Sequence, residues 1–305
     1  MNIVDILRDI KSGRKKKVIL DTDAYNEADD QYALAYCRMS GRIDLAAVNA
    51  APFANERSDN DYALGEKLSY REIKKVLSLI DTGDGDKTPV FRGSTVRAAQ
   101  IGGAGGEALS PAAENLIRCV RESDDAVYVL AIGAATNIAS ALAAAPDIKD
   151  NMAVIWLAGN EFGCSDSWEF NLMQDVGAGQ ILLESGAALM LCPAWSVVSA
   201  LSADDVLVGE LKGANPVCDY LCENTEKYCG SGKWKKIIWD IAAPAILDLP
   251  ECADIDIVPA PELSDSGEYS FERRGHDILY LRRIDRDAVF KRAWEVLKGK
   301  DTASE

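Results

Sequence analysis

One repeated pattern restricts the fold of this 305-residue chain: short, uniformly apolar runs alternate with stretches of helical periodicity. The apolar runs lie at 18–20, 43–48, 126–133, 152–159 and 187–192. Helical patterns cover a short opening segment and residues 28–39, 61–80, 110–122, 136–145, 174–185, 214–228, 240–248 and 287–298. Strands that are apolar on both faces are typical of a parallel sheet covered by helices on both sides. We therefore predict an α/β fold with a mostly parallel sheet flanked by helices, as one domain over residues 1–305.

Residues 81–108 depart from this alternation because they are rich in glycine, aspartate and threonine. We predict a long loop region there. Ligands of parallel sheets bind beyond the carboxyl ends of the strands, so we look for functional residues directly after each apolar run.

The net charge of −16 limits the partners of the chain. Such an acidic protein repels nucleic acid and anionic membranes, whereas a divalent cation or a neutral small molecule suits its field. No run of about twenty apolar residues predicts a membrane span, and the N-terminus shows no signal-peptide pattern. The eight cysteines lie mostly in apolar or helical stretches, which is typical of reduced cysteines in a cytoplasmic protein. Cys218, Cys222 and Cys229 lack the paired spacing of a zinc knuckle.

The segment 18–34, VILDTDAYNEADDQYAL, carries five acids within ten residues. Asp21 and Asp23 end the first apolar run and point the same way, because side chains alternate along a strand. Glu27, Asp29 and Asp30 follow at the start of the next helix. These acids would repel one another at one strand end, and a hard cation such as calcium or magnesium would relieve that repulsion. A capped helix preceded by solvated acids is the other interpretation of this segment.

Four segments in order resemble motifs of the nucleoside hydrolase family. The strand ending in DTD and followed by DD resembles the family motif D-x-D-P-G-x-D-D. The stretches LAIGAATNIASAL (130–142), WEFNLMQDVGAGQILLESG (168–186) and WDIAAPAIL (239–247) resemble the family's G-P-L-T-N, A-E-F-N and H-D segments. The resemblance covers about residues 16–250 and implies the Rossmann-like nucleoside hydrolase fold.

The resemblance also implies roles for individual residues. The calcium ligands would be Asp23, Asp30, Asp240 and the backbone oxygen of Ile132. The ribose would be held by Asp29, Glu169 and Asn171, and Asp21 would orient the other acids. Asp23 would also act as general base for a metal-bound water that attacks the anomeric carbon of a nucleoside or related ribosyl compound. The family further implies a homodimer or homotetramer.

Two departures from the family pattern bear on the substrate. The loop 24–28 has five residues where the family usually has three, so Tyr25, Asn26 or Glu27 could enter the ribose pocket. Trp239 stands where many members have the histidine that protonates the leaving base. The single histidine, His276, is interpreted as a surface residue before a late strand. Candidates for stacking on the base are Trp239, Trp168, Trp195 and Tyr25.

Polar residues after other strands are further substrate-binding candidates, with turn or cap roles as the alternative. Asn55 follows the second apolar run, with Asn49 as a competitor for the same role, and Asn160 follows the run at 152–159. Two other functions stay open at this point. One is a metal-dependent ribose- or nucleoside-binding protein without turnover, and the other is a phosphatase of the haloacid dehalogenase type, suggested by DTD after a strand.

Overall fold

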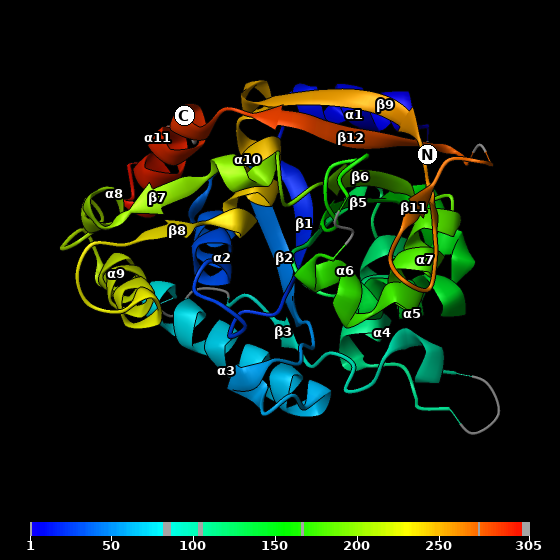
Figure 1. Cartoon of the computed structure of the whole chain (residues 1–305), viewed down its shortest axis with the longest axis horizontal. Coiled ribbons are helices and arrows are strands. Elements are labelled where there is room, and N and C mark those ends of the chain that lie inside the picture. The colour runs from blue at the N-terminus through cyan, green and yellow to red at the C-terminus, as the bar shows by residue number, and fades with distance from the viewer. Residues whose placement is uncertain (1, 82–86, 103–105, 166–167, 274, 301–305) are drawn as a thin grey trace.

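The computed structural model describes residues 2–81, 87–102, 106–165, 168–273 and 275–300, and its centre is one eight-stranded sheet (Figure 1). Its strands are β1 (Lys16–Thr22), β2 (Ile43–Ala50), β3 (Val90–Phe91), β4 (Val127–Ala131), β5 (Met152–Leu157), β6 (Ala188–Cys192), β9 (Ala253–Pro259) and β12 (Asp277–Ile284). They lie in the order β3-β2-β1-β4-β5-β6-β12-β9. Neighbouring strands from β3 to β12 pair in parallel, and only the edge strand β9 is antiparallel. The predicted mostly parallel sheet is confirmed.

Helices cover both faces of this sheet. They are α1 (Ile3–Lys11), α2 (Asp30–Met39), α3 (Tyr62–Ile80), α4 (Pro111–Arg121), α5 (Thr136–Ala144), α7 (Val176–Glu184), α9 (Pro216–Cys229), α10 (Ala242–Asp248) and α11 (Arg286–Leu297). Side chains of α4, α5 and α7 form one core with Ile19, while those of the other six helices form a second core with Val18 and Leu20. Figure 1 shows α2, α3 and α9 on the opposite side of the sheet from α4, α5 and α7. The alternation along β1 thus explains why this strand is apolar throughout.

Short elements connect the main ones. They are α6 (Phe170–Gln174), α8 (Asp205–Gly209), β7 (Ser202–Asp204), β8 (Lys235–Ile237), β10 (Glu262–Leu263), β11 (Tyr269–Ser270) and the 3-10 turns η1 (Glu56–Ser58), η2 (Ala98–Gln100), η3 (Pro146–Asn151), η4 (Val198–Ala200), η5 (Trp239–Ile241) and η6 (Pro250–Cys252). β8 pairs with β7 outside the central sheet and leads directly into η5. This ribbon brings Lys236 and the amide of Trp239 into contact with Asp29, which lies between β1 and α2.

The predicted elements correspond closely to these bounds, with three differences. Edge strand β9 was not predicted, because Asp254 and Asp256 interrupt its apolar residues and three of its seven residues are exposed. The predicted loop over 81–108 contains strand β3, which pairs with β2 at the sheet edge, and the turn η2; residues 82–86 and 103–105 lie outside the described part. The helix predicted over 174–185 begins only at Val176, because Asp175 ends α6 and accepts a hydrogen bond from the amide of Ala178 as the cap of α7.

The cysteine and membrane predictions concern segments that the structure also describes. Cys218, Cys222 and Cys229 lie on helix α9, as their helical periodicity predicts. All eight cysteines are free thiols, and five of them are buried. Within the described ranges, no helix combines the length and the apolar character needed to cross a membrane.

Candidate active site

The acids of segment 18–34 gather where β1 ends and α2 begins. The chain turns after β1, and the amide of Asn26 donates to the carbonyl of Asp23 across 2.7 Å. Asp30 is the first residue of α2, and its carboxylate accepts a hydrogen bond of 2.5 Å from the hydroxyl of Thr22. A strand end and a helix start are thereby tied together, and the acids between them converge.

A third element, η5, brings Asp240 into this group. Carboxylate oxygens of Asp29, Asp30 and Asp240 all lie within 4.8 Å of one another, and each residue is at most 4% exposed. Burial, followed by the charge of Asp29, raises the pKa of Asp30 to about 7. Burial and the charges of Asp30, Asp29 and Asp23 raise the pKa of Asp240 well above its usual range. Three acids so close together resist ionisation unless a cation joins them.

Asp23 completes the cluster from the end of β1. It is 1% exposed, and its Oδ2 has no hydrogen-bond partner among the described residues. Burial first, and then the charge of Asp30, raises the pKa of Asp23. The chain after β4 passes against this side chain, since a Cβ at Gly133 would lie 3.1 Å from Cγ of Asp23. Ile132 precedes this glycine and lines the same cavity as Asp23.

Asp21 lies behind the cluster rather than in the cavity. Its Oδ2 accepts a hydrogen bond of 3.1 Å from Asn137, and its backbone oxygen accepts the amide of Ile132 at 2.9 Å. Burial raises the pKa of Asp21 to about 7. Its contacts connect the end of β1 to the segment after β4, and its role in orienting the other acids stays a prediction.

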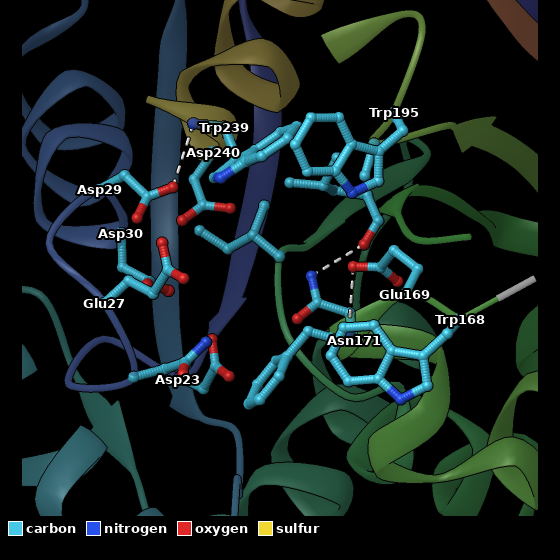
Figure 2. A pocket seen from close by; sticks show the side chains of 15 residues that line it. Asp23, Glu27, Asp29, Asp30, Trp168, Glu169, Asn171, Trp195, Trp239 and Asp240 are labelled. Atoms are coloured by element: carbon cyan, nitrogen blue, oxygen red, sulfur yellow. Dashed lines mark hydrogen bonds between the residues drawn. The ribbon is translucent and has the colours of Figure 1, made fainter. Parts of the chain in front are cut away.

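The acids line one side of a cavity of about 210 Å³ (Figure 2). Glu169, Asn171, Trp168 and Trp195 lie across the cavity from them. This arrangement joins a polar, acidic floor to a wall that carries both amide and aromatic groups. A small ligand with hydroxyl groups at one end and a flat ring at the other would match it.

The polar part of that wall is fixed by the start of α6. Glu169 caps this helix and accepts hydrogen bonds from the amides of Asn171, Leu172 and Gly159 at 3.1, 3.0 and 2.8 Å. Burial nevertheless raises the pKa of Glu169 to about 7. The side-chain nitrogen Nδ2 of Asn171 donates to the carbonyl of Leu157 across 2.9 Å, which fixes the orientation of this side chain.

Aromatic side chains form the outer part of the cavity. Trp168 and Trp195 are 57% and 53% exposed, so they are not core residues and remain accessible to a ligand. The rings of Trp195 and Trp239 meet edge to face at 5.3 Å, and those of Trp168 and Phe170 at 6.5 Å. Exposed indole rings at the mouth of a cavity are suited to stacking on a heterocyclic base.

The structure separates the remaining candidates into two groups. Asn26 lines the cavity and accepts a hydrogen bond of 2.6 Å from Asn55, which itself caps η1 outside the lining. Asn160 donates to the carbonyl of Trp168 at 3.0 Å, and Tyr25 lies under the guanidinium of Arg57 at 4.3 Å. Asn55, Asn160 and Tyr25 thus do not line this cavity, and each contacts a neighbouring segment; their ligand-binding roles stay predictions.

Asn49 and His276 also lie away from the cavity lining. Asn49 is fully buried in β2 beside Asp21, its partner in the strand register. His276 is half-buried directly before β12, close to the predicted position before a late strand. Neither residue therefore contributes to the lining that the acids and tryptophans share.

Sequence reasoning missed one residue, Lys236 of β8. Its ammonium lies 3.0 Å from Oδ1 of Asp29 and 2.5 Å from Oε2 of Glu27, which also lines the cavity. Nothing in the sequence distinguishes Lys236 from the neighbouring Lys233 and Lys235. Only the fold of the β7–β8 ribbon places this lysine at the acid cluster.

Known proteins share both the sequence pattern and the fold. A family model described as "Inosine-uridine preferring nucleoside hydrolase" matches residues 18–289. The pyrimidine-specific ribonucleoside hydrolase RihA of Enterobacter sp. (strain 638) is 27% identical over 194 residues, which is 57% of this chain and 58% of that relative. The RihA of Salmonella arizonae is 26% identical over the same shares of the two chains. The chain therefore spans less than two thirds of the length of these curated relatives.

Solved structures extend the comparison to almost the whole chain. A structure titled "Plant nucleoside hydrolase - PpNRh1 enzyme" has a TM-score of 0.73 at 17% identity and covers 93% of this chain and 99% of its own. An "Inosine-Guanosine Nucleoside Hydrolase (IG-NH)" has a TM-score of 0.72 at 18% identity, covering 93% and 98%. At this identity they establish a common fold. Because the family model matches residues 18–289 of the 305, the chain belongs to the inosine-uridine preferring nucleoside hydrolase family.

Proposed function

We propose that this chain hydrolyses the N-glycosidic bond of a nucleoside or related ribosyl compound, with calcium as its cofactor. One observation carries the proposal: buried acids line one side of a cavity, and an amide and exposed tryptophans line the opposite side. The matching family model supports the reaction class. The haloacid dehalogenase-type alternative has no support, because the matching family model describes nucleoside hydrolases.

The residues present fit a calcium ion. Asp23, Asp30, Asp240 and the backbone oxygen of Ile132 offer only oxygen ligands, which calcium prefers. Asp23 Oδ2 lacks a hydrogen-bond partner among the described residues, and the other two acids lie in a cluster whose pKa values are raised. A bound calcium would supply positive charge that acidifies and orients water and ribose hydroxyls.

The side chains then divide the work of the reaction. Asp23 accepts a proton from the attacking water, which reaches the anomeric carbon from the acidic side of the cavity. Asp29 accepts a hydrogen bond from a ribose hydroxyl, and Glu169 and Asn171 bind the sugar from the opposite wall. These contacts fix the ribose for attack and stabilise the oxocarbenium character of the transition state.

The leaving base lies among the tryptophans in this proposal. Trp239 occupies the position of the family's histidine, so protonation of the base comes from solvent instead of an imidazole. Stacking on Trp195 or Trp168 holds the base in the orientation that allows this protonation. The relatives named above act on pyrimidine nucleosides or carry inosine and guanosine in their names, so both purine and pyrimidine nucleosides are candidate substrates.

The test is release of reducing sugar from a panel of purine and pyrimidine nucleosides, with and without a calcium chelator. We expect release that the chelator abolishes and that added calcium restores. Asp23→Asn should lose turnover while retaining the fold. Nucleoside binding without any sugar release, by wild type at saturating calcium, would overturn hydrolysis and support the alternative of a binding protein without turnover.

The assembly state is a separate part of the proposal. We infer a homodimer or homotetramer from the family resemblance. Sedimentation velocity of the purified chain tests it directly. A species at twice or four times the monomer mass is expected, and a monomer at all concentrations would contradict it.

A further inference from the structure

Lys236 makes a three-way contact at the edge of the acid cluster. Its ammonium donates to Oε2 of Glu27 at 2.5 Å, to Oδ1 of Asp29 at 3.0 Å and to the carbonyl of Ile237 at 2.8 Å. An ammonium has three donors, so these contacts use all of them. The side chain is only 8% exposed. Lys236 is therefore held in one place and orientation.

The position of this lysine is unexpected beside a cation site. A fixed positive charge next to the acids repels a divalent cation and weakens its binding. The lysine is not needed to neutralise the acids, because a bound cation would neutralise them. The contacts of Asp29 indicate another role. One of its oxygens accepts from Lys236, and the other accepts from the amide of Trp239 at 3.0 Å.

Asp29 would otherwise be an equal competitor for the metal. Its carboxylate lies within 4.8 Å of those of Asp30 and Asp240, so distance alone does not distinguish the three acids. The two hydrogen bonds do distinguish it, because they fix both oxygens of Asp29 toward the β8–η5 segment. Asp30 instead is fixed by Thr22 at the other side, at the end of β1.

We propose that Lys236 is a positioning residue that keeps Asp29 away from the metal and available to the ribose hydroxyls. This inference rests on the proposed function and names the residue that divides the acid cluster between metal and substrate. Glu27 balances the charge of Lys236, so that the trio Glu27, Lys236 and Asp29 carries the net charge of a single aspartate.

The longer loop 24–28 supplies this Glu27 and is held in place by Arg57. The guanidinium of Arg57 donates to the carbonyl of Glu27 at 3.2 Å and lies over the ring of Tyr25 at 4.3 Å. It also lies 5.6 Å from the ring of Tyr228 on α9. The additional loop residues thereby contribute to the arrangement of Asp29, while Asn26 and Glu27 also line the cavity.

Calcium titration calorimetry at fixed ionic strength tests the inference on wild type, Lys236→Met, Lys236→Arg and Glu27→Gln. Lys236→Met should bind calcium about tenfold more tightly, because a repulsive charge is lost and Asp29 is released to the metal. Lys236→Arg should remain near wild type, and Glu27→Gln should bind several-fold more weakly. Unchanged or weaker calcium binding by folded Lys236→Met would overturn the inference, as would tighter binding by Glu27→Gln.

Crystal structures with calcium provide the second measurement. We expect Asp29 within about 2.6 Å of the ion in Lys236→Met but not in wild type. Coordination by Asp29 in wild type would refute the role of Lys236. The hydrolase proposal fails separately: an intact order of calcium affinities without nucleoside turnover would overturn only the activity, whereas no calcium binding by wild type would overturn both.

Discussion

The acid cluster predicts that Asp240→Asn changes stability in opposite directions with and without calcium. Asp240 is 4% exposed, and its carboxylate lies within 4.8 Å of those of Asp29 and Asp30. At an effective dielectric constant of about 20, two full charges at 4.8 Å repel by about 3 kcal/mol. Without metal, the substitution removes this repulsion and should stabilise the fold.

The gain is smaller than the full repulsion, because the wild type relieves part of it by protonation. Burial and the neighbouring acids raise the pKa of Asp240 well above its usual range, so we choose pH 8, where a larger fraction of the acids is ionised than at neutral pH. We expect Asp240→Asn to be about 1–3 kcal/mol more stable than wild type with a chelator. With calcium at about a thousand times its dissociation constant, wild type gains about 4.1 kcal/mol, which exceeds the advantage of the variant, and the order reverses.

Urea denaturation at pH 8, followed by circular dichroism, measures both conditions. Asp248→Asn is the matched control, because Asp248 is equally buried but contacts Arg292 at 2.5 Å and the hydroxyls of Tyr36 and Ser40. That substitution removes the carboxylate that pairs with the partly buried guanidinium of Arg292 and should destabilise the protein by about 3–5 kcal/mol in both conditions. If Asp240→Asn is less stable than wild type in chelator, the reasoning from charge repulsion is refuted.

Three further predictions concern the two sides of the cavity. Because the pKa of Glu169 is raised to about 7 in the fold, protonation of Glu169 stabilises the protein below pH 4.5, and this contribution is lost as the pH rises through 7. At saturating calcium, Glu169→Gln should therefore flatten the decline in the free energy of unfolding between pH 4.5 and about 7. An unchanged slope in urea titrations would contradict it. Trp195→Ala should raise KM for nucleosides about fivefold, as loss of about 1 kcal/mol of stacking predicts, with calcium affinity unchanged by calorimetry; a change in calcium affinity alone would argue against stacking. Gly133→Ala should weaken calcium binding at least tenfold, because its Cβ would lie 3.1 Å from Cγ of Asp23; wild-type affinity would show that Asp23 does not need this close approach.

The sequence predicted the sheet and the acids because both depend on local patterns. Apolar runs such as 126–133 and 152–159 correspond to β4 and β5. Asp23 and Asp30 follow the carboxyl end of β1, which is where parallel sheets place their ligand-binding residues. Edge strand β3 was missed because it has two residues, too few for a periodic signal. The extent of the domain over 1–305 stays a prediction.

Lys236 could not be predicted because its role depends on a long-range contact. Its ion-pair partner Asp29 lies 207 residues earlier in the chain, and only the β7–β8 ribbon brings the two together. The positions of Asn55 and Tyr25 outside the cavity lining could not be predicted for the same reason. Asn55 donates a hydrogen bond to Asn26, and Tyr25 packs under Arg57, so both side chains bind neighbouring residues instead of lining the cavity.

The most direct test of the central claim is the fate of oxygen during turnover. The chain is incubated with a nucleoside and calcium in water enriched in ¹⁸O, and the products are analysed at once by mass spectrometry. Attack of water on the anomeric carbon predicts one ¹⁸O in the released ribose, none in the base, and loss of both products in Asp23→Asn. Release of base without labelled ribose, or no release by wild type, would contradict hydrolysis at this site.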